Sequence, residues 1–502
     1  MKRIFILLVA LSILNTGCKQ YLDVKPHGET TQGELFKTQK GFRDVLTGAY
    51  IQMKSSNIYG GNLMWGNIEY MANNWDNVNT SNTVIPALVS GNYTNQGVRD
   101  IFDAIYQDLY KVIADVNPIL ENIDAQKSVF TDGNYAITKG EALALRAFCH
   151  FDVLRMFGPI PTNPGTGPIL PYVKTVTKNI HELLSYQEFS RSILADLDEA
   201  EVLLKDVDPI MKYSIAQLNP GINGQSVLTD NYLEYRQVRM NYYAVLALKA
   251  RIYNWLSASD NTNRANATKY AQMVIAGVDG TGTPTFRLGV DNDRAAEDYT
   301  MPSEHIMALS VYNLESIANS LFGNQGSLQR YDFSYQEGFY YLNNLFPVSE
   351  RVADIRWKGQ MFYYKTTPGL ESYVTYKKFI QKAVPPDRQT LQVPLIRLSE
   401  MYLILTECAE TKAAAEVAYT AYCDKKGIPF TLFNNADWLT DRRNKMIREY
   451  VREFFAEGQS FFTYKRYNVT TLPASWTSVY YNATPAKYLV PKPDREINYN
   501  NN

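Results

Sequence analysis

The stretch GEALALRAFCHFDVLRMFGPIP at residues 140–161 constrains the fold more than any other part of this sequence. Alanines and large apolar residues occur on every side of the helix that it predicts, and such a helix must be covered all round by other elements. The small residues let neighbouring helices approach closely, and the large ones fill the space between them. Gly158, Pro159 and Pro161 then stop the helix. We therefore expect a central helix buried among other helices.

Two arginines, Arg146 and Arg155, interrupt this apolar helix, with Glu141 and Asp152 nearby. A buried cation needs a charged or hydrogen-bonding partner, because removing it from water is costly. We expect acidic residues of another helix to meet both arginines.

A second charged row lies near the end of the chain. Glu449, Glu453 and Glu457 are spaced four residues apart and would share one face of a helix. Like charges at this spacing repel unless cations lie opposite them, and Arg397 and Arg466 are the candidates from outside the row. Two interpretations stay open: a solvated acidic stripe, or buried charge pairs between helices.

Helical periodicity recurs along most of the chain. The predicted helices begin near Gly33 and continue at residues 98–123, 140–157, 186–204, 241–256 and 265–275, in a segment that begins at Val393, and at residues 438–456. The pair at 241–275 has the spacing of about 34 residues that is typical of a tetratricopeptide unit. The predicted fold class is therefore mainly all-α, built from helical hairpins.

Two segments break the helical rhythm, residues 55–95 and residues 280–390. Both are rich in aromatic and polar residues and are punctuated by Gly or Pro. We expect long irregular loops there, with a minor β-hairpin between Met361 and Phe379. Because long loops in compact proteins often carry function, both segments are candidate binding surfaces.

The first residues predict export and a lipid anchor. Two basic residues precede the apolar run Ile4–Leu14, which has the length of a signal peptide and is too short to span a bilayer as a stable helix. The run ends in Leu-Asn-Thr-Gly-Cys, which resembles a bacterial lipoprotein signal. We expect a signal peptide over residues 1–17, a lipid on Cys18 and an extended tether over residues 18–32.

No group of residues predicts catalysis, a metal site or a cofactor site. The chain has four histidines and lacks the H-E-x-x-H, nucleophile-elbow, Walker and G-x-G-x-x-G motifs. His150 lies within the central helix and is interpreted as a hydrogen-bonded core residue. A net charge of −1 without a basic stripe argues against nucleic-acid binding. Glycoside hydrolysis needs only two carboxylates, so a helical-toroid hydrolase stays open.

The three later cysteines predict no metal site. Cys149 and Cys408 lie in apolar helices and are interpreted as small buried hydrophobes. A disulfide among these two and Cys423 stays open.

The aromatic content favours sugar binding. The chain contains 37 tyrosines, and a sugar ring stacks its C–H face on an aromatic ring while its hydroxyls need planar polar partners. Both kinds of side chain occur together in the first irregular segment. The predicted ligand-binding residues are Trp65, Tyr70, Asn74, Trp75 and Asp76. The alternative is that Trp75 fixes the loop onto the helices.

Four landmarks in chain order resemble the SusD/RagB family of nutrient-binding outer-membrane lipoproteins. They are Cys18 with the following YLDVKP, the helix at 140–161, the segment Arg397-Leu-Ser-Glu400-Met-Tyr-Leu, and the run Arg448-Glu449, Glu453-Phe454, Glu457-Gly458, Phe461-Phe462 and Arg466. The resemblance implies a SusD-like scaffold of tetratricopeptide-like hairpins. It also implies an N-terminal helical region at 33–279, with a ligand loop at about 55–97, and a C-terminal region at 280–502 on the same scaffold.

The resemblance further implies a function. Its members are lipid-anchored, non-catalytic proteins at the surface of the outer membrane, which capture oligosaccharides and deliver them to a SusC-like TonB-dependent transporter. We expect this chain to be such a glycan-uptake lipoprotein. A peptide-binding RagB-like lipoprotein and the helical-toroid glycoside hydrolase are the alternatives.

Overall fold

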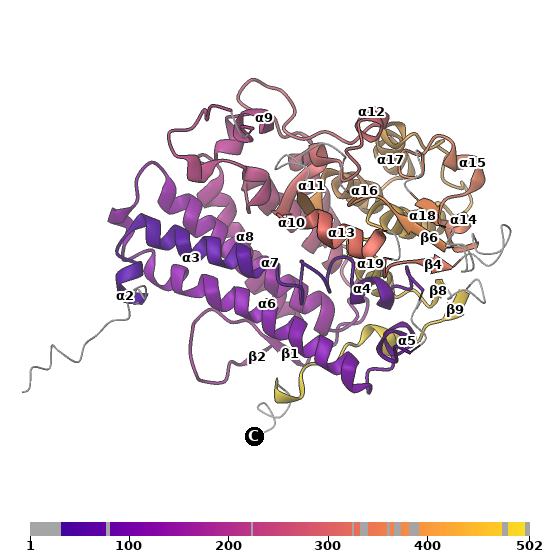
Figure 1. Ribbon diagram of the computed structural model, residues 1–502, viewed down its shortest axis with the longest axis horizontal. Helices are drawn as coiled ribbons and strands as arrows, with labels where there is room; N and C mark the ends of the chain where they lie inside the picture. Colours follow the sequence, from indigo (N-terminus) through magenta and orange to yellow (C-terminus); the bar gives the residue numbers. More distant parts are fainter. Residues whose placement is uncertain are drawn as a thin grey trace, which may run out of the picture.

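The computed structural model of the protein describes residues 32–76, 81–221, 224–323, 326–331, 340–358, 362–365, 373–380, 391–473 and 480–496. Most of them are helical (Figure 1). The helices are α2 (Gln32–Leu35), α3 (Gln39–Gln52), α4 (Asn67–Met71), α5 (Val84–Ser90), α6 (Gln96–Asn122), α7 (Asn134–Phe157), α8 (Tyr186–Leu204), α9 (Ile215–Leu218), α10 (Tyr242–Leu256), α11 (Asn263–Ile275), α12 (Asp291–Ala295), α13 (Leu314–Phe322), α14 (Tyr340–Leu345), α15 (Val348–Arg351), α16 (Leu398–Cys408), α17 (Lys412–Lys426), α18 (Trp438–Glu453) and α19 (Ser460–Tyr467). The strands are β1 (Pro168–Pro171), β2 (Leu183–Ser185), β3 (His305–Ser310), β4 (Arg330–Tyr331), β5 (Phe362–Lys365), β6 (Tyr373–Tyr376), β7 (Gln392–Arg397), β8 (Thr471–Pro473) and β9 (Tyr480–Asn482).

The long helices pack one after another along the molecule. Helix α6 lies against α3 and α7, and α7 lies against α8. Helix α8 contacts α10, which pairs with α11, and α11 meets α16, which packs on α17 and α18. In Figure 1 this series runs from the indigo helices on the left to the orange ones on the right. The mainly all-α, tetratricopeptide-like fold predicted from the sequence is confirmed, and helices α6, α8, α10 and α11 begin and end within two residues of their predicted bounds.

Helix α7 is the predicted central helix, and every residue from Gly140 to Phe157 is buried. Arg146 meets an acidic residue of another helix, as expected: its Nε and Nη2 atoms donate to the two carboxylate oxygens of Asp196 on α8, at 2.7 and 2.8 Å. For Arg155 the expectation is wrong. Its Nε donates to Asp152 of the same helix at 2.9 Å, because the carboxylate lies one turn away.

Gly158 ends α7, but not by a left-handed conformation. Its φ of −78° and ψ of 176° are extended, and any residue can adopt them. A proline restricts the residue before it to extended conformations, and Pro159 follows directly. The proline therefore ends this helix.

The segment after Val393 differs from its prediction as a helix. It forms β7, which pairs antiparallel with β3, and α16 begins only at Leu398. All six residues of β7 are buried. A short apolar run that is covered on both faces lacks the alternation that identifies a strand, so periodicity could not separate it from a helix.

The predicted β-hairpin is confirmed, since β5 and β6 pair antiparallel. The last long helix is shorter than predicted, because α18 ends at Glu453 rather than at residue 456. Ala456 and Gly458 then take left-handed φ values of 60° and 71°. A Cβ atom on Gly458 would overlap the carbonyl oxygen of Leu63, so this turn requires glycine.

The glutamates of the predicted row are buried, and the interpretation as a solvated stripe is wrong. They belong to the central charge cluster, which consists of Glu304, Glu449, Glu453, Glu457, Arg356, Lys378, Arg397 and Lys426. Arg397 donates to Glu304 at 2.9 Å, to Glu453 at 2.7 Å and to Glu457 at 3.0 Å. Arg466 does not join it: this arginine pairs with Glu407 on α16. Buried charge pairs between distant segments are thus confirmed.

Burial alone would raise the pKa of Glu453, but Lys426, Arg397 and Arg356 hold it well below its usual range. Glu453 is therefore ionised at neutral pH. Breaking the central charge cluster by removing one member leaves uncompensated charge in the interior.

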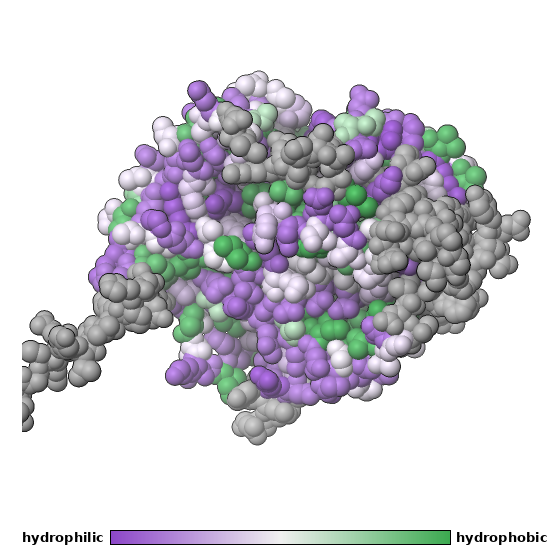
Figure 2. Space-filling model, in the orientation of Figure 1, coloured by the Kyte–Doolittle hydropathy of each residue, from purple (hydrophilic) through white to green (hydrophobic). Residues whose placement is uncertain are grey.

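The surface drawn in colour in Figure 2 is mainly hydrophilic, with hydrophobic residues in small separate groups. Such isolated groups are normal for a folded chain in water. The predicted signal peptide, Cys18 and the tether up to residue 31 lie outside the described residues. The domain division at residues 279 and 280 stays a prediction.

Candidate functional site

The five residues predicted to bind ligand lie in a turn-rich segment around the short helix α4, and all five are buried. Trp65 packs edge-on against Phe379, with ring centroids 5.2 Å apart. Trp75 lies between Phe322 and Phe455, at centroid distances of 5.9 and 5.1 Å. Only 2% of the Trp75 side chain is exposed. This placement agrees with the alternative in which Trp75 fixes the loop onto the rest of the protein.

The polar members of this set form hydrogen bonds that fix the segment to the rest of the protein. Asn74 donates from Nδ2 to Glu69 at 2.7 Å and to the hydroxyl of Ser460 at 2.9 Å. The hydroxyl of Tyr70 donates to the carbonyl of Ser327 at 3.2 Å. The amide of Asp76 donates to the carbonyl of Gln329 at 2.9 Å and forms an isolated β-bridge with that residue.

The side chains of an arginine and a lysine from distant parts of the chain also bind this loop. Arg330 donates to the carbonyls of Asn73 and Asn74 at 2.8 and 3.2 Å. Lys487 donates to Oδ1 of Asn73 at 3.4 Å and also to the carbonyl of Val89. The segment is therefore tied to three distant parts of the chain. Contact of its five predicted residues with a ligand stays a prediction.

Glu69 lies beneath this loop and is completely buried. Its carboxylate accepts hydrogen bonds from Asn74 Nδ2 and from the backbone amides of Ala456 and Gly458, at 2.7, 3.2 and 2.9 Å. Burial raises the pKa of Glu69 to about 7, despite these three donors. Between about pH 4.5 and pH 7, Glu69 is therefore largely protonated in the folded protein and largely ionised in the unfolded chain.

Glu69→Gln is expected to change how stability depends on pH. Because the folded-state pKa is raised, the contribution of Glu69 to the free energy of unfolding falls by about 3 kcal/mol as pH rises from about 4.5 to about 7. Glutamine cannot ionise and lacks this fall. Urea unfolding of both proteins across this pH range measures the difference between their profiles. Parallel profiles would show that the carboxyl titrates normally.

A groove of about 510 Å³ lies between α6 and the segment at 171–181. We call it the tyrosine groove, and it is lined by Tyr106, Gln107, Tyr110, Pro171, Val173, Lys178, Asn179, Ile180, His181 and Glu496. The rings of Tyr106 and Tyr110 lie 4.7 Å apart between centroids. Exposed polar groups of Gln107, Lys178 and Asn179 surround them. The groove thus combines aromatic surface with hydrogen-bonding groups.

The sequence analysis placed Tyr106 and Tyr110 in the predicted helix at 98–123 and named neither as a binding residue. Tyrosines four residues apart lie next to each other on a helix, so their spacing could have indicated a pair of neighbouring aromatic rings. Packing of the loop at 171–181 against that face could not be read from the periodicity.

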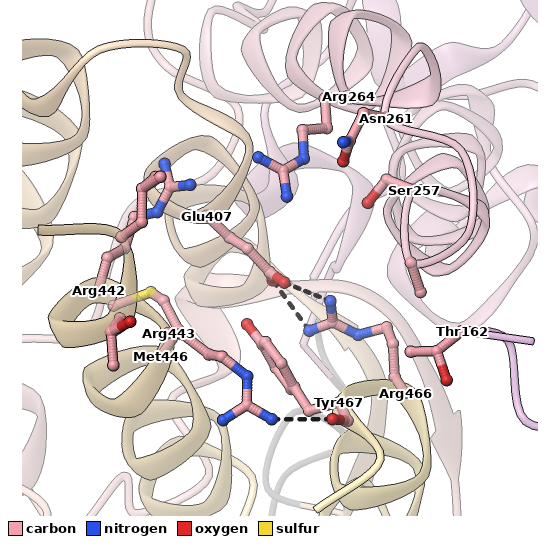
Figure 3. A pocket seen from close by; sticks show the side chains of 13 residues that line it. Thr162, Ser257, Asn261, Arg264, Glu407, Arg442, Arg443, Met446, Arg466 and Tyr467 are labelled. Atoms are coloured by element: carbon pink, nitrogen blue, oxygen red, sulfur yellow. Dashed lines mark hydrogen bonds and ion pairs between the residues drawn. The ribbon is translucent and has the colours of Figure 1, made fainter. Parts of the chain in front are cut away.

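A second cleft, of about 440 Å³, lies between the N-terminal and C-terminal helices (Figure 3). We call it the cationic cleft, and its lining residues are Thr162, Ser257, Ala258, Asn261, Arg264, Glu407, Leu439, Thr440, Arg442, Arg443, Met446, Arg466 and Tyr467. Thr162 follows α7. The others lie at or just beyond the ends of α10 and α16, near the start of α11, and on α18 and α19. Of its four arginines, the sequence analysis singled out only Arg466.

The histidines and cysteines of the core serve packing. His150 donates from Nδ1 to the carbonyl of Arg146 and accepts from the amide of Val173 at Nε2. Burial lowers its pKa well below the usual range, so the ring is neutral. Cys149, Cys408 and Cys423 are buried and free, which closes the question of a disulfide among them.

The described residues contain neither a candidate metal site nor a candidate membrane-spanning helix. Among them, no three His, Cys, Asp or Glu side chains are grouped so that they could hold a metal ion. In the same ranges, no helix combines the length and the apolar character needed to cross a bilayer.

Comparison with known proteins identifies relatives by sequence. Residues 20–216 match the family model SusD-like_3, described as starch-binding associating with outer membrane. Two proteins of Formosa agariphila, SusD-like protein P38 and SusD-like protein P25, are 27% and 24% identical to this chain over 197 and 204 residues. These alignments cover 39% and 38% of this chain and 36% of each relative, so they concern about a third of those proteins.

Solved structures share the fold along nearly the whole chain. A SusD superfamily protein from Bacteroides thetaiotaomicron has a TM-score of 0.67 at 18% identity, covering 92% of this chain and 98% of its own. A putative sugar binding protein and a SusD-like carbohydrate binding protein, both from Bacteroides vulgatus, have TM-scores of 0.64 and 0.63, each at 19% identity. They cover 92% and 93% of this chain, and 96% and 97% of their own chains.

The sequence match covers the helices up to α9, and the structural likeness extends over 92% of the chain. Residues 20–216 are thus similar in sequence to the SusD-like family, and the chain shares its fold with SusD superfamily structures.

Proposed function

We propose that this protein is a non-catalytic, lipid-anchored binding protein of the outer-membrane surface, which captures oligosaccharides and passes them to a SusC-like TonB-dependent transporter. The observation that carries the proposal is the match to a family described as starch-binding and outer-membrane associated. Two proteins with the same fold carry sugar or carbohydrate binding in their names, which supports the same ligand class.

The tyrosine groove supports glycan binding at a defined place. The half-buried ring of Tyr110, backed by the buried ring of Tyr106, offers an apolar surface on which a sugar can stack. Gln107 and Asn179 carry planar amides that can donate to and accept from neighbouring hydroxyl groups. The volume of about 510 Å³ is in the range of small-molecule sites.

Glycan and peptide arrays probed with the purified protein test the proposal. Saturable binding to oligosaccharides without cleavage would support it. Release of shorter sugars from a bound glycan would favour the helical-toroid hydrolase, and binding to peptides alone would favour the RagB-like alternative. Copurification of a TonB-dependent transporter from native outer membranes tests the proposed partner.

The double variant Gln107→Ala with Asn179→Ala is expected to bind a glycan identified on the array about tenfold or more weakly. Each neutral hydrogen bond contributes about 1 kcal/mol, and 1.4 kcal/mol is a tenfold change in affinity. Both side chains are exposed, so the fold should tolerate their loss. Titration calorimetry measures the affinity, and Gln272→Ala on the exposed face of α11 is the matched control. An unchanged affinity would move the binding site away from the tyrosine groove.

A further inference from the structure

The cationic cleft has an unusual balance of charge. Four guanidinium groups and one carboxylate line it, which leaves three positive charges in excess. The carboxylate, Glu407, is already engaged, since Arg466 donates to both of its oxygens and Asn254 donates to one of them at 3.1 Å. Neither charge of that pair is available to balance the other three arginines.

Arg264 enters the cleft without a partner. No hydrogen bond or ion pair of its side chain is found among the described residues, and its Nε is shielded from solvent and unbonded. A buried donor without an acceptor costs free energy, so a structure normally supplies one. In Figure 3 the Arg264 guanidinium extends into the space that faces Arg442 and Glu407.

Arg442 and Arg443 line the opposite side of the cleft, on α18. Arg442 donates to the carbonyl of Ala409 at 2.6 Å and lies over the ring of Trp438, 4.7 Å from its centroid. Arg443 is exposed and donates to the carbonyl of Tyr467 at 2.9 Å, as Figure 3 shows. Carbonyl groups satisfy these N–H donors but carry no net charge to neutralise them.

The repulsion between Arg264 and Arg442 affects the pKa of Arg442. Burial lowers the pKa of Arg442, and the positive charge of Arg264 lowers it further. Like charges are brought together here from α11 and α18, since Arg264 and Arg442 are 178 residues apart in the sequence. An anion between them would relieve this repulsion and accept from the free donors.

We propose that the cationic cleft binds an oxyanion, a carboxylate or a sulfate or phosphate group, held by Arg264 and Arg443 and flanked by Arg442. Guanidinium groups suit this ligand because their parallel N–H donors match the spacing of its oxygens. Hydroxyl and amide groups at the rim, on Asn261 and Thr440, can bind the remainder of a small molecule. The volume of about 440 Å³ accommodates either a free ion or an acidic monosaccharide. The site is separate from the tyrosine groove and does not depend on the proposed glycan function.

Titration calorimetry with sodium sulfate and with sodium glucuronate, at constant ionic strength in sodium chloride, tests this site. The wild-type protein is expected to give saturable binding with at least one of them. Arg264→Gln combined with Arg443→Gln should weaken that binding at least tenfold, whereas Arg191→Gln on the exposed face of α8 should leave it unchanged. Tighter binding of glucuronate identifies an acidic sugar as the source of the anion, and tighter binding of sulfate identifies a free ion or a sulfate group.

Three results would overturn the proposal: no saturable binding of either anion at millimolar concentration, equal binding of the anions by the double variant, or equally tight binding of neutral glucose that the double variant also loses. Melting temperatures provide a second readout. In chloride alone, Arg264→Gln should melt no lower than the wild type because it removes a repelling charge. Sulfate should raise the melting temperature of the wild type more than that of the variant, because its general stabilising effect acts on both. If the double variant fails to fold, Arg264→Gln alone carries the test, since its side chain holds no other part of the protein.

Discussion

Arg397→Ala is expected to lower the free energy of unfolding by about 3–5 kcal/mol, the cost of removing one partner from a buried ion pair. Arg397 contacts three carboxylates that arrive from separate segments, Glu304, Glu453 and Glu457. Only 2% of its side chain is exposed, so water cannot replace the lost donors. Lys378, Lys426 and Arg356 remain, but all three carboxylates lose the guanidinium group that they share. Urea unfolding at pH 7 measures the change.

Arg287→Ala is the matched control. Arg287 also pairs with a carboxylate, Asp293 at 2.7 Å, but 57% of its side chain is exposed. Exposed pairs contribute about 0–1 kcal/mol, so the two alanine variants should differ several-fold in their cost. A similar small cost for both would mean that the central charge cluster is hydrated in solution. Loss of the cluster's stabilisation should also appear in the wild type in acid, as pH falls through the depressed pKa of Glu453.

Trp75→Ala is expected to destabilise the protein by about 3–5 kcal/mol, as is usual when a large buried aromatic residue is truncated. The indole fills the space between Phe322 and Phe455, and the loop around it is tied down on both sides, so the cavity cannot close easily. Urea unfolding measures the loss. Tyr312→Ala, at a residue that is 86% exposed, should change stability by less than about 0.5 kcal/mol.

Trp75→Phe separates packing from ligand binding. Phenylalanine restores part of the buried surface, so most of the stability should return. If Trp75 contacts a glycan, Trp75→Phe will fold and bind weakly; if it only packs, the variant will bind like the wild type. A small loss of stability in Trp75→Ala would contradict the packing role.

The scaffold could be predicted from the sequence because its signals are long and redundant. The helix that contains Phe148 and Phe151 is apolar all round, and no solvent-exposed element satisfies that pattern. The glutamate row was also informative, although Glu457 lies beyond the end of α18 and reaches the cluster from a turn. The strand at 392–397 was missed because all six of its residues are buried, so the sequence lacks the alternation of apolar and polar residues that identifies a strand.

The binding surface could not be predicted to the same depth. An aromatic residue beside amides, as at Asn74 and Trp75, fits a sugar site and a loop attachment equally well, and the choice depends on what covers the ring. Phe322 and Phe455, the residues that cover it, are remote in sequence. The cationic cleft was missed for the same reason: Arg264 and Arg443 come to line one cleft only after α11 and α18 are packed.

The two sets of buried charges differ in how much of the polypeptide they need. Around α7, Arg146 binds Asp196, and Arg236 binds Glu141 and Asp208, so every partner lies between residues 141 and 236. Arg397 instead requires Glu304 before it and Glu457 after it. Whatever channel the chain emerges from, its N-terminal part comes out first, so the first set can form while the C-terminal part is still held back. The second set cannot form until nearly all of the chain has emerged, so the N-terminal half can fold while the other half still lacks its counter-ions.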